Sequence, residues 1–367
     1  MDRRNFFRLA GASSAAVALP GLVSSAFAEA APASQEAPAG WRTFEVTTRV
    51  EVTKPVGITR IWLPTPLSTD TPYQRGLGNT WSSESGKVSF GTDPKFGAGM
   101  VWAEFPEGEK PALVLVSRFA TRDIAIDLSQ PGNAKAEDKA ILARFTAPSD
   151  LLPTDGIVKQ TSAEIVKGKR TDLEKARALY EWVVENTFRD AKTRGCGVGD
   201  IKFMLENNVM GGKCADLNAL FVALARAEGI PARDVYGVRV AGSGLGYKSL
   251  GRTGGDITNA QHCRAEFYLP THGWVPVDPA DVRKVMLEED GGKKLDDPMV
   301  VAARKRLFGS WEMNWLAFNY AHDLVLPGSS KGKVGFLMYP QSETAEGRLD
   351  SLDPANFKYV ITAKEIV

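Results

Sequence analysis

Short alternating runs of apolar and polar residues fill the first part of the chain. Residues 44–52 alternate regularly enough to predict a β-strand with one buried and one exposed face. Further apolar runs predict strands at 58–63, 101–105 and 113–119, and Pro and Gly residues separate them. A sheet made of such strands has one apolar face, and it can bury that face by packing against a second sheet. We therefore predict a β-sandwich-like domain over residues 41–130.

A helical period replaces this alternation after Cys214. Apolar residues there follow the i, i+3, i+4, i+7, i+8 spacing of one helix face: Leu217, Leu220, Phe221, Leu224 and Ala225. Gly229 and Pro231 mark the end of this helix. Weaker patterns predict helices at 173–184, starting near Thr171, and at 203–209.

Strand-like runs follow the helix at 234–240, 262–269 and 273–277. A Gly-rich loop at 242–255 lies between the first two runs. No helix follows its Gly-Ser-Gly-Leu-Gly motif, so we predict a hairpin loop that borders a cleft and not a phosphate cradle.

These helices and strands predict a second domain over 135–290, and residues 291–367 are predicted to be a C-terminal extension that packs on it. The extension contains an aromatic-rich stretch that we predict to be helical, with His322 as a core residue. The stretch includes Trp311, Trp315 and Phe318.

The N-terminus has the features of an export signal. Residues 1–28 combine basic residues, a weakly apolar run and an Ala-Phe-Ala cleavage site. Arg3 and Arg4 favour a twin-arginine signal, and an ordinary secretory signal is the alternative. Residues 29–40, rich in Ala and Pro, are predicted to be a flexible linker. The expected location of the mature protein is the periplasm, or the outside of the cell membrane.

Composition narrows the class of protein. The chain has 367 residues, 43% hydrophobic and 24% charged, which is typical of a globular protein with two or three domains. A net charge of +1 argues against nucleic acid as a partner. After signal cleavage no stretch approaches the roughly 20 apolar residues that cross a bilayer, so no stable membrane insertion is expected.

Three cysteines do not make a disulfide scaffold, even in an oxidising compartment. The odd number leaves at least one thiol free. We expect Cys214 to be free, with Cys196 and Cys263 as a candidate pair. The sequence contains no CxxC pair and no calcium-binding loop, and we predict neither a metal site nor a cofactor.

Cys214 follows Gly211, Gly212 and Lys213 and opens the predicted helix. A helix N-terminus presents free N–H groups and a partial positive charge, which favour a thiolate over a thiol. The alternative is a buried cysteine that only packs.

Two further residues carry candidate chemistry. Strand 262–269 places His262 on its polar face together with Arg264 and Glu266, so His262 is well placed as a base that faces a cleft. Asp278 ends the next strand and can orient the imidazole. A structural histidine and a turn-forming aspartate are the alternatives.

Together these motifs resemble the transglutaminase-like superfamily, a branch of the papain-like cysteine enzymes. The resemblance covers about 170–290. It includes the Gly-x-Cys of Cys214, the Leu-Phe-x-Ala-Leu-Ala-Arg-Ala helix, Gly-Ile-Pro-Ala-Arg at 229–233, and the spacing to His262 and to Asp278 in Gly-Trp-Val-Pro-Val-Asp-Pro.

The resemblance implies an α+β fold, with a papain-like transglutaminase core preceded by the β-sandwich-like domain. It implies Cys214 as nucleophile, His262 as general base and acid, and Asp278 as the orienting carboxylate. Arg264 departs from the family, which often has an aromatic residue two positions after the histidine. Arg264 either binds a substrate carboxylate or pairs with Glu266.

The expected function is acyl transfer from an amide through a thioester, with the backbone N–H of Cys214 as one oxyanion donor. Hydrolysis is favoured over cross-linking because calcium-activation loops are absent and many bacterial relatives appear hydrolytic. The expected partner is a peptide or protein substrate, with peptidoglycan peptides as one hypothesis. The alternatives are a cross-linking transglutaminase, a non-catalytic scaffold that kept the fold, and a redox sensor that uses Cys214.

Overall fold

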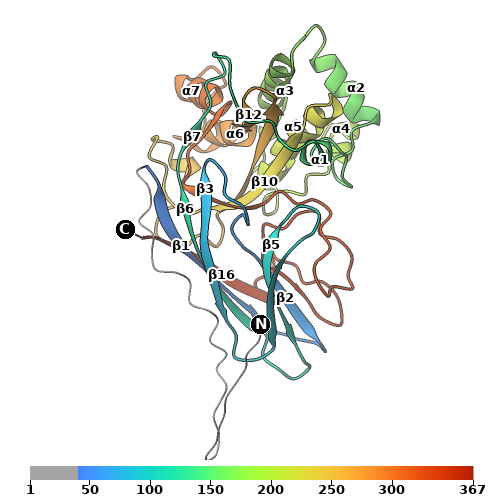
Figure 1. The fold of residues 1–367 in the computed structure, drawn as a ribbon, viewed down its shortest axis with the longest axis vertical. Helices are drawn as coiled ribbons and strands as arrows, with labels where there is room; N and C mark the ends of the chain where they lie inside the picture. Colours follow the sequence, from blue (N-terminus) through green and yellow to red (C-terminus); the bar gives the residue numbers. More distant parts are fainter. Residues whose placement is uncertain (1–39, 367) are drawn as a thin grey trace, which may run out of the picture. The chain divides into compact units, whose positions relative to one another are not determined.

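A computed structural model describes residues 40–366 of the chain. The predicted signal peptide at 1–28 and nearly all of the predicted linker at 29–40 lie outside the described residues. Figure 1 shows the helices gathered on one side of a set of antiparallel sheets. The described part of the chain therefore has a mixed α+β fold.

Two four-stranded antiparallel sheets form a sandwich. The first has the order β16 (Phe357–Ile366), β1 (Arg42–Val52), β6 (Ala112–Thr121) and β3 (Gln74–Ser82). The second has the order β15 (Gln341–Glu343), β2 (Thr59–Pro64), β5 (Gly99–Phe105) and β4 (Lys87–Thr92). Apolar side chains from both sheets fill the space between them, among them Val50, Ile61, Val101, Leu113 and Phe357.

A third antiparallel sheet carries the residues with candidate chemistry. Its order is β12 (Gly273–Val277), β11 (Gln261–Leu269), β10 (Ala232–Arg239) and β14 (Trp315–Asn319). The Gly-rich loop joins β10 to β11 as a hairpin connection and contains the short 3-10 helix η1 (Lys248–Leu250).

Helices cover one face of this third sheet, with α5 (Cys214–Ala227) lying on β10 and β11. The remaining helices are α1 (Lys139–Arg144), α2 (Gly156–Ile165), α3 (Asp172–Asn186), α4 (Ile201–Glu206), α6 (Pro279–Glu288) and α7 (Pro298–Arg306). Two minor sheets pair β7 (Ile124–Ala125) with β13 (Ser310–Trp311), and β8 (Phe188–Arg189) with β9 (Gly211–Gly212).

One face of β1 contacts two different sheets. Phe44 and Val46 pack against side chains of the third sheet, including Val238 and Leu316. Further along the same face, Val50 and other residues pack against the second sheet of the sandwich. Since residues at even spacing lie on one side of a strand, β1 links the sandwich core to the third sheet without changing face.

Helix α5 is buried on all sides, not only on the apolar face that its periodicity predicted. The third sheet covers one side and helices α2, α3 and α6 cover the others. Its buried polar side chains are hydrogen-bonded, which offsets the loss of water. Arg226, for example, donates from Nε to the carbonyl of Ala232 at 2.8 Å. A helix buried all round forms the centre of a core.

The helix predicted at 173–184 is confirmed as α3, whose Thr171 hydroxyl accepts from the N–H of Glu174 at 3.2 Å as N-cap. The helix predicted at 203–209 instead spans Ile201–Glu206. It begins earlier because the Asp200 carboxylate caps it by accepting from the N–H of Phe203 at 3.0 Å.

The last part of the chain differs from the predicted extension. β14, β15 and β16 each form an edge strand of a different sheet, so residues after 290 complete all three large sheets. The aromatic-rich stretch is strand, not helix, at Trp315–Asn319. Its residues are buried on both faces, by the sandwich and by a cluster around Trp311, so no strand-like alternation marks it.

Among residues 40–366, no helix combines the length and the apolar character that crossing a bilayer requires.

Phe357 tests whether β16 belongs to the core. Its side chain has no exposed surface and lies between the two sandwich sheets, whereas the neighbouring Lys358 points outward. We expect Phe357→Ala to lower the free energy of unfolding by about 3–5 kcal/mol, because it leaves a cavity. Lys358→Ala, the matched control, should change it by less than about 0.5 kcal/mol. Chemical denaturation measures both, and a small loss for Phe357→Ala would show that β16 is dispensable.

Candidate active site

Cys214 is the first residue of α5, and a carboxylate holds the chain around it. Asp216 accepts hydrogen bonds from the N–H groups of Lys213 at 2.9 Å, Gly199 at 2.9 Å and Val198 at 3.0 Å. The N–H of Ala215 donates to the carbonyl of Cys196 at 2.9 Å. These bonds fix the loop before α4 against the N-terminus of α5.

Position 212, just before Lys213, has no room for a side chain, which explains the glycine there. A Cβ on Gly212 would lie 2.6 Å from the Cβ of Asp216, which is closer than real side chains approach. The backbone N–H of Cys214 has no acceptor among the described residues. It therefore stays available at the start of the helix, where a developing negative charge is stabilised.

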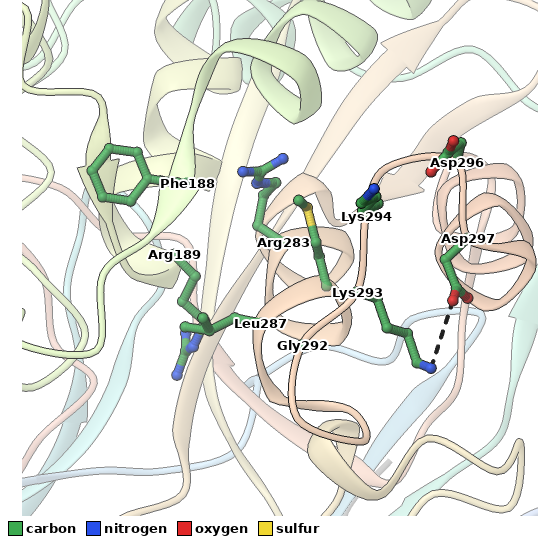
Figure 2. Close-up of a pocket in the computed structure, with 10 residues that line it drawn as sticks. Phe188, Arg189, Arg283, Leu287, Gly292, Lys293, Lys294, Asp296 and Asp297 are labelled. Carbon is green, nitrogen blue, oxygen red and sulfur yellow. Dashed lines mark ion pairs between the residues drawn. The ribbon is translucent and has the colours of Figure 1, made fainter.

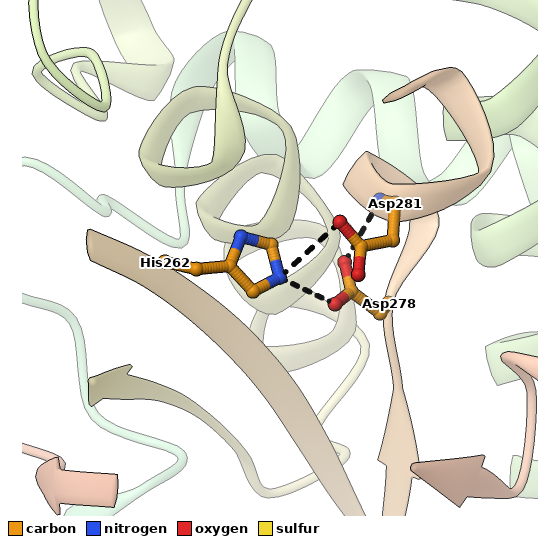
Figure 3. A group of neighbouring side chains, drawn as sticks. All are labelled: His262, Asp278 and Asp281. Carbon is orange, nitrogen blue, oxygen red and sulfur yellow. Dashed lines mark hydrogen bonds and ion pairs between the residues drawn. The ribbon is translucent and has the colours of Figure 1, made fainter. Parts of the chain in front are cut away.

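His262 lies on β11 beside two buried carboxylates, as Figure 3 shows. Its Nε2 is 2.7 Å from Oδ2 of Asp278 and 3.4 Å from Oδ1 of Asp281. Asp278 caps α6, because its Oδ1 accepts from the N–H of Asp281 at 3.0 Å. With Nε2 directed at the carboxylates, Nδ1 is the ring nitrogen left for the thiol.

Asn218 joins the elements that carry these residues. It lies one helical turn after Cys214, and its Nδ2 donates to the carbonyl of Cys263 at 2.8 Å and to Oδ1 of Asp278 at 3.2 Å. Its side-chain oxygen, Oδ1, accepts from the N–H of Ala280 at 3.4 Å. One buried amide thus ties α5, β11 and the start of α6 together.

The surroundings favour a thiolate at Cys214. Hydrogen bonds from the thiols of Cys196 and Cys263, and then the imidazole of His262, hold the pKa of Cys214 well below its usual range despite burial. The hydrogen bond to Cys214 raises the pKa of Cys196, and burial raises the pKa of Cys263. Of the three thiols, Cys214 is the one that ionises most readily.

The same surroundings favour an imidazolium at His262. Burial and the nearby Arg239 oppose its charge, but the carboxylates of Asp281 and Asp278 outweigh them and raise the pKa of His262 to about 10. At neutral pH the arrangement therefore holds a thiolate and an imidazolium side by side.

Asp281 and Arg239 are parts of the site that the sequence did not indicate. Arg239 Nη2 lies 2.6 Å from Oδ1 of Asp281, and both side chains are almost fully buried. Burial alone would raise the pKa of Asp281, but Arg239 and His262 hold it well below the usual range. The pattern Asp-Pro-x-Asp at 278–281 is a helix-start signal that would have placed Asp281 near Asp278.

His262, Asp278 and Asp281 also form a group whose ligand atoms lie within 4.8 Å of one another. A cation would compete there with the guanidinium of Arg239, and it would need His262 to give up its proton. Since both charges already satisfy the carboxylates, the donor set fits a hydrogen-bonded charge network better than a metal centre.

The candidate disulfide is not formed. Cys196, Cys214 and Cys263 are all free and buried, and Cys196 and Cys263 instead lie within hydrogen-bonding reach of Cys214. The Sγ of Cys196 is also 3.3 Å from the carbonyl of Gln261.

Arg264 occupies neither position that we expected. Its side chain is 3% exposed and donates to the carbonyl of Glu312 at 2.9 Å, with its guanidinium 4.7 Å from the ring centre of Trp315. Its Nε lies 3.7 Å from Asp278, behind the site and away from the cavity. Glu266 pairs with Arg233 instead, at 2.7 Å. The sheet is covered on both faces, so its polar face does not open to solvent.

The two other histidines lie apart from this network. His322 is buried, with its Nε2 3.0 Å from Asp234 and 3.3 Å from the hydroxyl of Tyr236, which agrees with the predicted core role. His272 is half-buried in its turn and hydrogen-bonds the carbonyl of Gln130 at 3.0 Å.

A cavity of about 300 Å³ opens beside Cys214 and His262. Residues of the β10–β11 loop form one wall, including Ser249, Gly251 and Arg252. The Gly-rich loop therefore borders the cavity, as its position between two strands suggested.

Known proteins resemble this chain over most of its length. The model of the transglutaminase-like superfamily matches residues 159–279. An uncharacterised protein of Haemophilus influenzae is 34% identical over 335 residues, which make up 84% of this chain and 87% of that protein.

One solved structure has a similar fold. A candidate cysteine protease of Cytophaga hutchinsonii has a TM-score of 0.50 at 16% identity, over 88% of this chain and 98% of that chain. The periplasmic domain of TgpA from Pseudomonas aeruginosa has a TM-score of 0.34 at 15% identity, over 67% of this chain and 91% of that chain. Because the family match spans the Cys214 helix, the His262 strand and Asp278, this chain belongs to the transglutaminase-like superfamily.

Proposed function

We propose that this protein is an exported acyl-transfer enzyme that hydrolyses amide bonds in peptides through a thioester on Cys214. One observation carries the proposal: Cys214 at the start of α5 faces an imidazole that two buried carboxylates keep protonated. A protein that only binds or supports others would have no use for three buried charges arranged around a thiolate, because buried charges lower stability unless they are paired.

In the first step, the Cys214 thiolate attacks the carbonyl carbon of the amide. The carbonyl oxygen becomes an oxyanion beside the free backbone N–H of Cys214. His262 transfers its proton to the leaving amine as the C–N bond breaks, and the acyl group stays on sulfur as a thioester. Asp278 orients the ring throughout and stabilises its charged form.

In the second step, neutral His262 takes a proton from water, and the hydroxyl oxygen attacks the thioester. The C–S bond breaks, which releases the carboxylic acid and restores the thiolate and the imidazolium. An amine in place of water would give transamidation by the same steps. We favour water because the sequence contains no calcium-activation loop.

Product analysis tests the reaction. Incubation with a peptide library, with and without a competing primary amine, should give hydrolysed peptides in both cases. Cys214→Ala should lower kcat/KM by roughly 10⁴-fold or more, because the covalent step is lost. Mass spectrometry of the products decides between the outcomes. Predominant incorporation of the amine would make the enzyme a cross-linking transglutaminase, and no turnover of any amide would favour a scaffold.

The pH dependence of Cys214 alkylation tests the ion pair. We expect a midpoint well below the ~8.5 of a free thiol, read by mass spectrometry of the Cys214 peptide. His262→Ala should raise the midpoint without restoring the free-thiol value, because Cys196 and Cys263 still hydrogen-bond the thiolate. The rate of amide hydrolysis should fall as the pH rises through about 10, because His262 then loses the proton that the leaving amine needs.

His272→Ala is the matched control for that experiment. His272 is a half-buried histidine beyond the far end of β11, and its ring hydrogen-bonds the hydroxyl of Thr271 and the carbonyl of Gln130. Its replacement should leave the midpoint of Cys214 unchanged. If His262→Ala and His272→Ala behave alike, the imidazole of His262 does not activate the thiol.

Export rests on the first 28 residues. We expect the mature chain to begin at Glu29 and to accumulate in the periplasm. Replacing Arg3 and Arg4 together with lysine should keep the chain in the cytoplasm, because a twin-arginine signal requires the arginine pair. Cell fractionation and intact mass measure both outcomes. Undiminished export of the lysine variant would assign the chain to the ordinary secretory route.

A further inference from the structure

Basic side chains gather around the cavity beside Cys214. Five basic side chains contribute to its wall, and no Asp or Glu does: Arg189, Lys213, Arg239, Arg252 and Lys284. We propose that this cavity binds a carboxylate of the substrate, so that the enzyme acts on peptides that carry a free carboxylate next to the scissile amide. This inference rests on the proposed function and adds its substrate class.

Carboxylates behind the wall neutralise only part of this charge. Arg239 pairs with Asp281, and Arg189 and Lys284 share Glu288. Lys213 and Arg252 have no carboxylate within ion-pair distance in the described part of the chain. Arg264 lies 3.7 Å from Asp278, and the imidazolium lies beside the thiolate. The charges of Lys213 and Arg252 are therefore the ones left without a counter-charge at the cavity.

The basic side chains of the cavity also act on one another. Burial, together with Arg239 and Arg189, lowers the pKa of Lys284 even though Glu288 hydrogen-bonds it. Cations held close together away from water are stabilised when an anion binds between them. A bound carboxylate would therefore offset both the burial of Lys284 and its repulsion from Arg239 and Arg189.

A second cavity shows that this lining is not a general property of the surface. It has a volume of about 650 Å³, shares Arg189 with the first, and is drawn in Figure 2. Its other basic residues, Arg283, Lys293 and Lys294, are accompanied by two acidic ones. Lys293 lies 3.7 Å from Asp297, so part of the charge there is paired within the wall.

The two unpaired cations flank the reacting atoms from different elements. Lys213 immediately precedes the nucleophile, whereas Arg252 comes from the β10–β11 loop that leads into His262. A carboxylate held by both would lie beside the thiol. The geometry suits either the terminal carboxylate of a peptide or an acidic side chain next to the scissile amide.

Two alkylating agents of similar size test the site without a known substrate. Iodoacetate carries a carboxylate and iodoacetamide does not, so the ratio of their rates at Cys214 reports the attraction of the cavity for an anion. The ratio is independent of the fraction of thiolate, since both reagents attack the same sulfur. Peptide mapping separates Cys214 from the two other cysteines.

We expect the double variant Lys213→Gln, Arg252→Gln to lower this ratio roughly tenfold, the effect of removing focused charge from a cleft. Lys213→Arg with Arg252→Lys should restore it, because charge is kept. Lys202→Gln on α4 is the control, since Lys202 is exposed and forms its ion pair with Glu206 on the same helix. If the double variant does not fold, Arg252→Gln alone, at an exposed position, should lower the ratio roughly threefold.

An unchanged ratio in these variants would overturn the carboxylate site while leaving Cys214 as a nucleophile. Failure of Cys214 to react with either reagent would overturn both proposals. Matched peptides then distinguish the two sources of carboxylate. A kcat/KM that falls on C-terminal amidation indicates the terminal group, and one that falls on Glu-to-Gln exchange indicates a side chain. No fall in either pair would contradict the inference.

Discussion

Two carboxylates buried beside one imidazole constrain the rest of the site. Asp278 is fully buried and Asp281 is 1% exposed, so water does little to stabilise their charges. Removing one partner of such a buried group typically costs about 3–5 kcal/mol. Arg239 and the protonated His262 must therefore both be in place, and β10, β11 and α6, which carry these residues, must hold a fixed arrangement.

The network also explains why a buried cysteine can be reactive. A thiol with 3% of its surface exposed would ordinarily stay protonated, because burial disfavours the thiolate. Here the charge is compensated by hydrogen bonds from two other thiols and by the imidazolium. The carboxylates act on the sulfur only through His262. They keep its ring protonated. Asn218, on the helix that begins at Cys214, holds Asp278 in place by donating a hydrogen bond to it.

Local patterns predicted the parts of the site that local chemistry determines. The helix after Cys214 and the strand of His262 follow from the apolar period, and Asp278 from its position at a strand end. Asp281 was missed although Asp-Pro-x-Asp marks a helix start, whereas Arg239 has no local signal because it reaches Asp281 only when α6 and β10 meet. Arg264 was placed wrongly because alternation shows which residues share a face of a strand, not whether that face is covered.

The same limit applies to the fold. Four of the eight sandwich strands were predicted, β1, β2, β5 and β6, and the clear alternation of β1 comes from its half-exposed position. β14 lies between two cores and has no exposed side, so its residues gave no strand period. A half-exposed strand can show a period of two in its sequence, whereas a strand buried on both faces does not.

The three edge strands near the C-terminus determine when this molecule can finish folding. Each large sheet lacks one strand until residues after 315 are available, and the pairing partner of β1 ends at Ile366. During synthesis the Cys214 helix and its charge network are made long before the strands that complete the sheets. A complete native core therefore forms only after β16 has left the ribosome. Contacts so distant in sequence also predict slow folding.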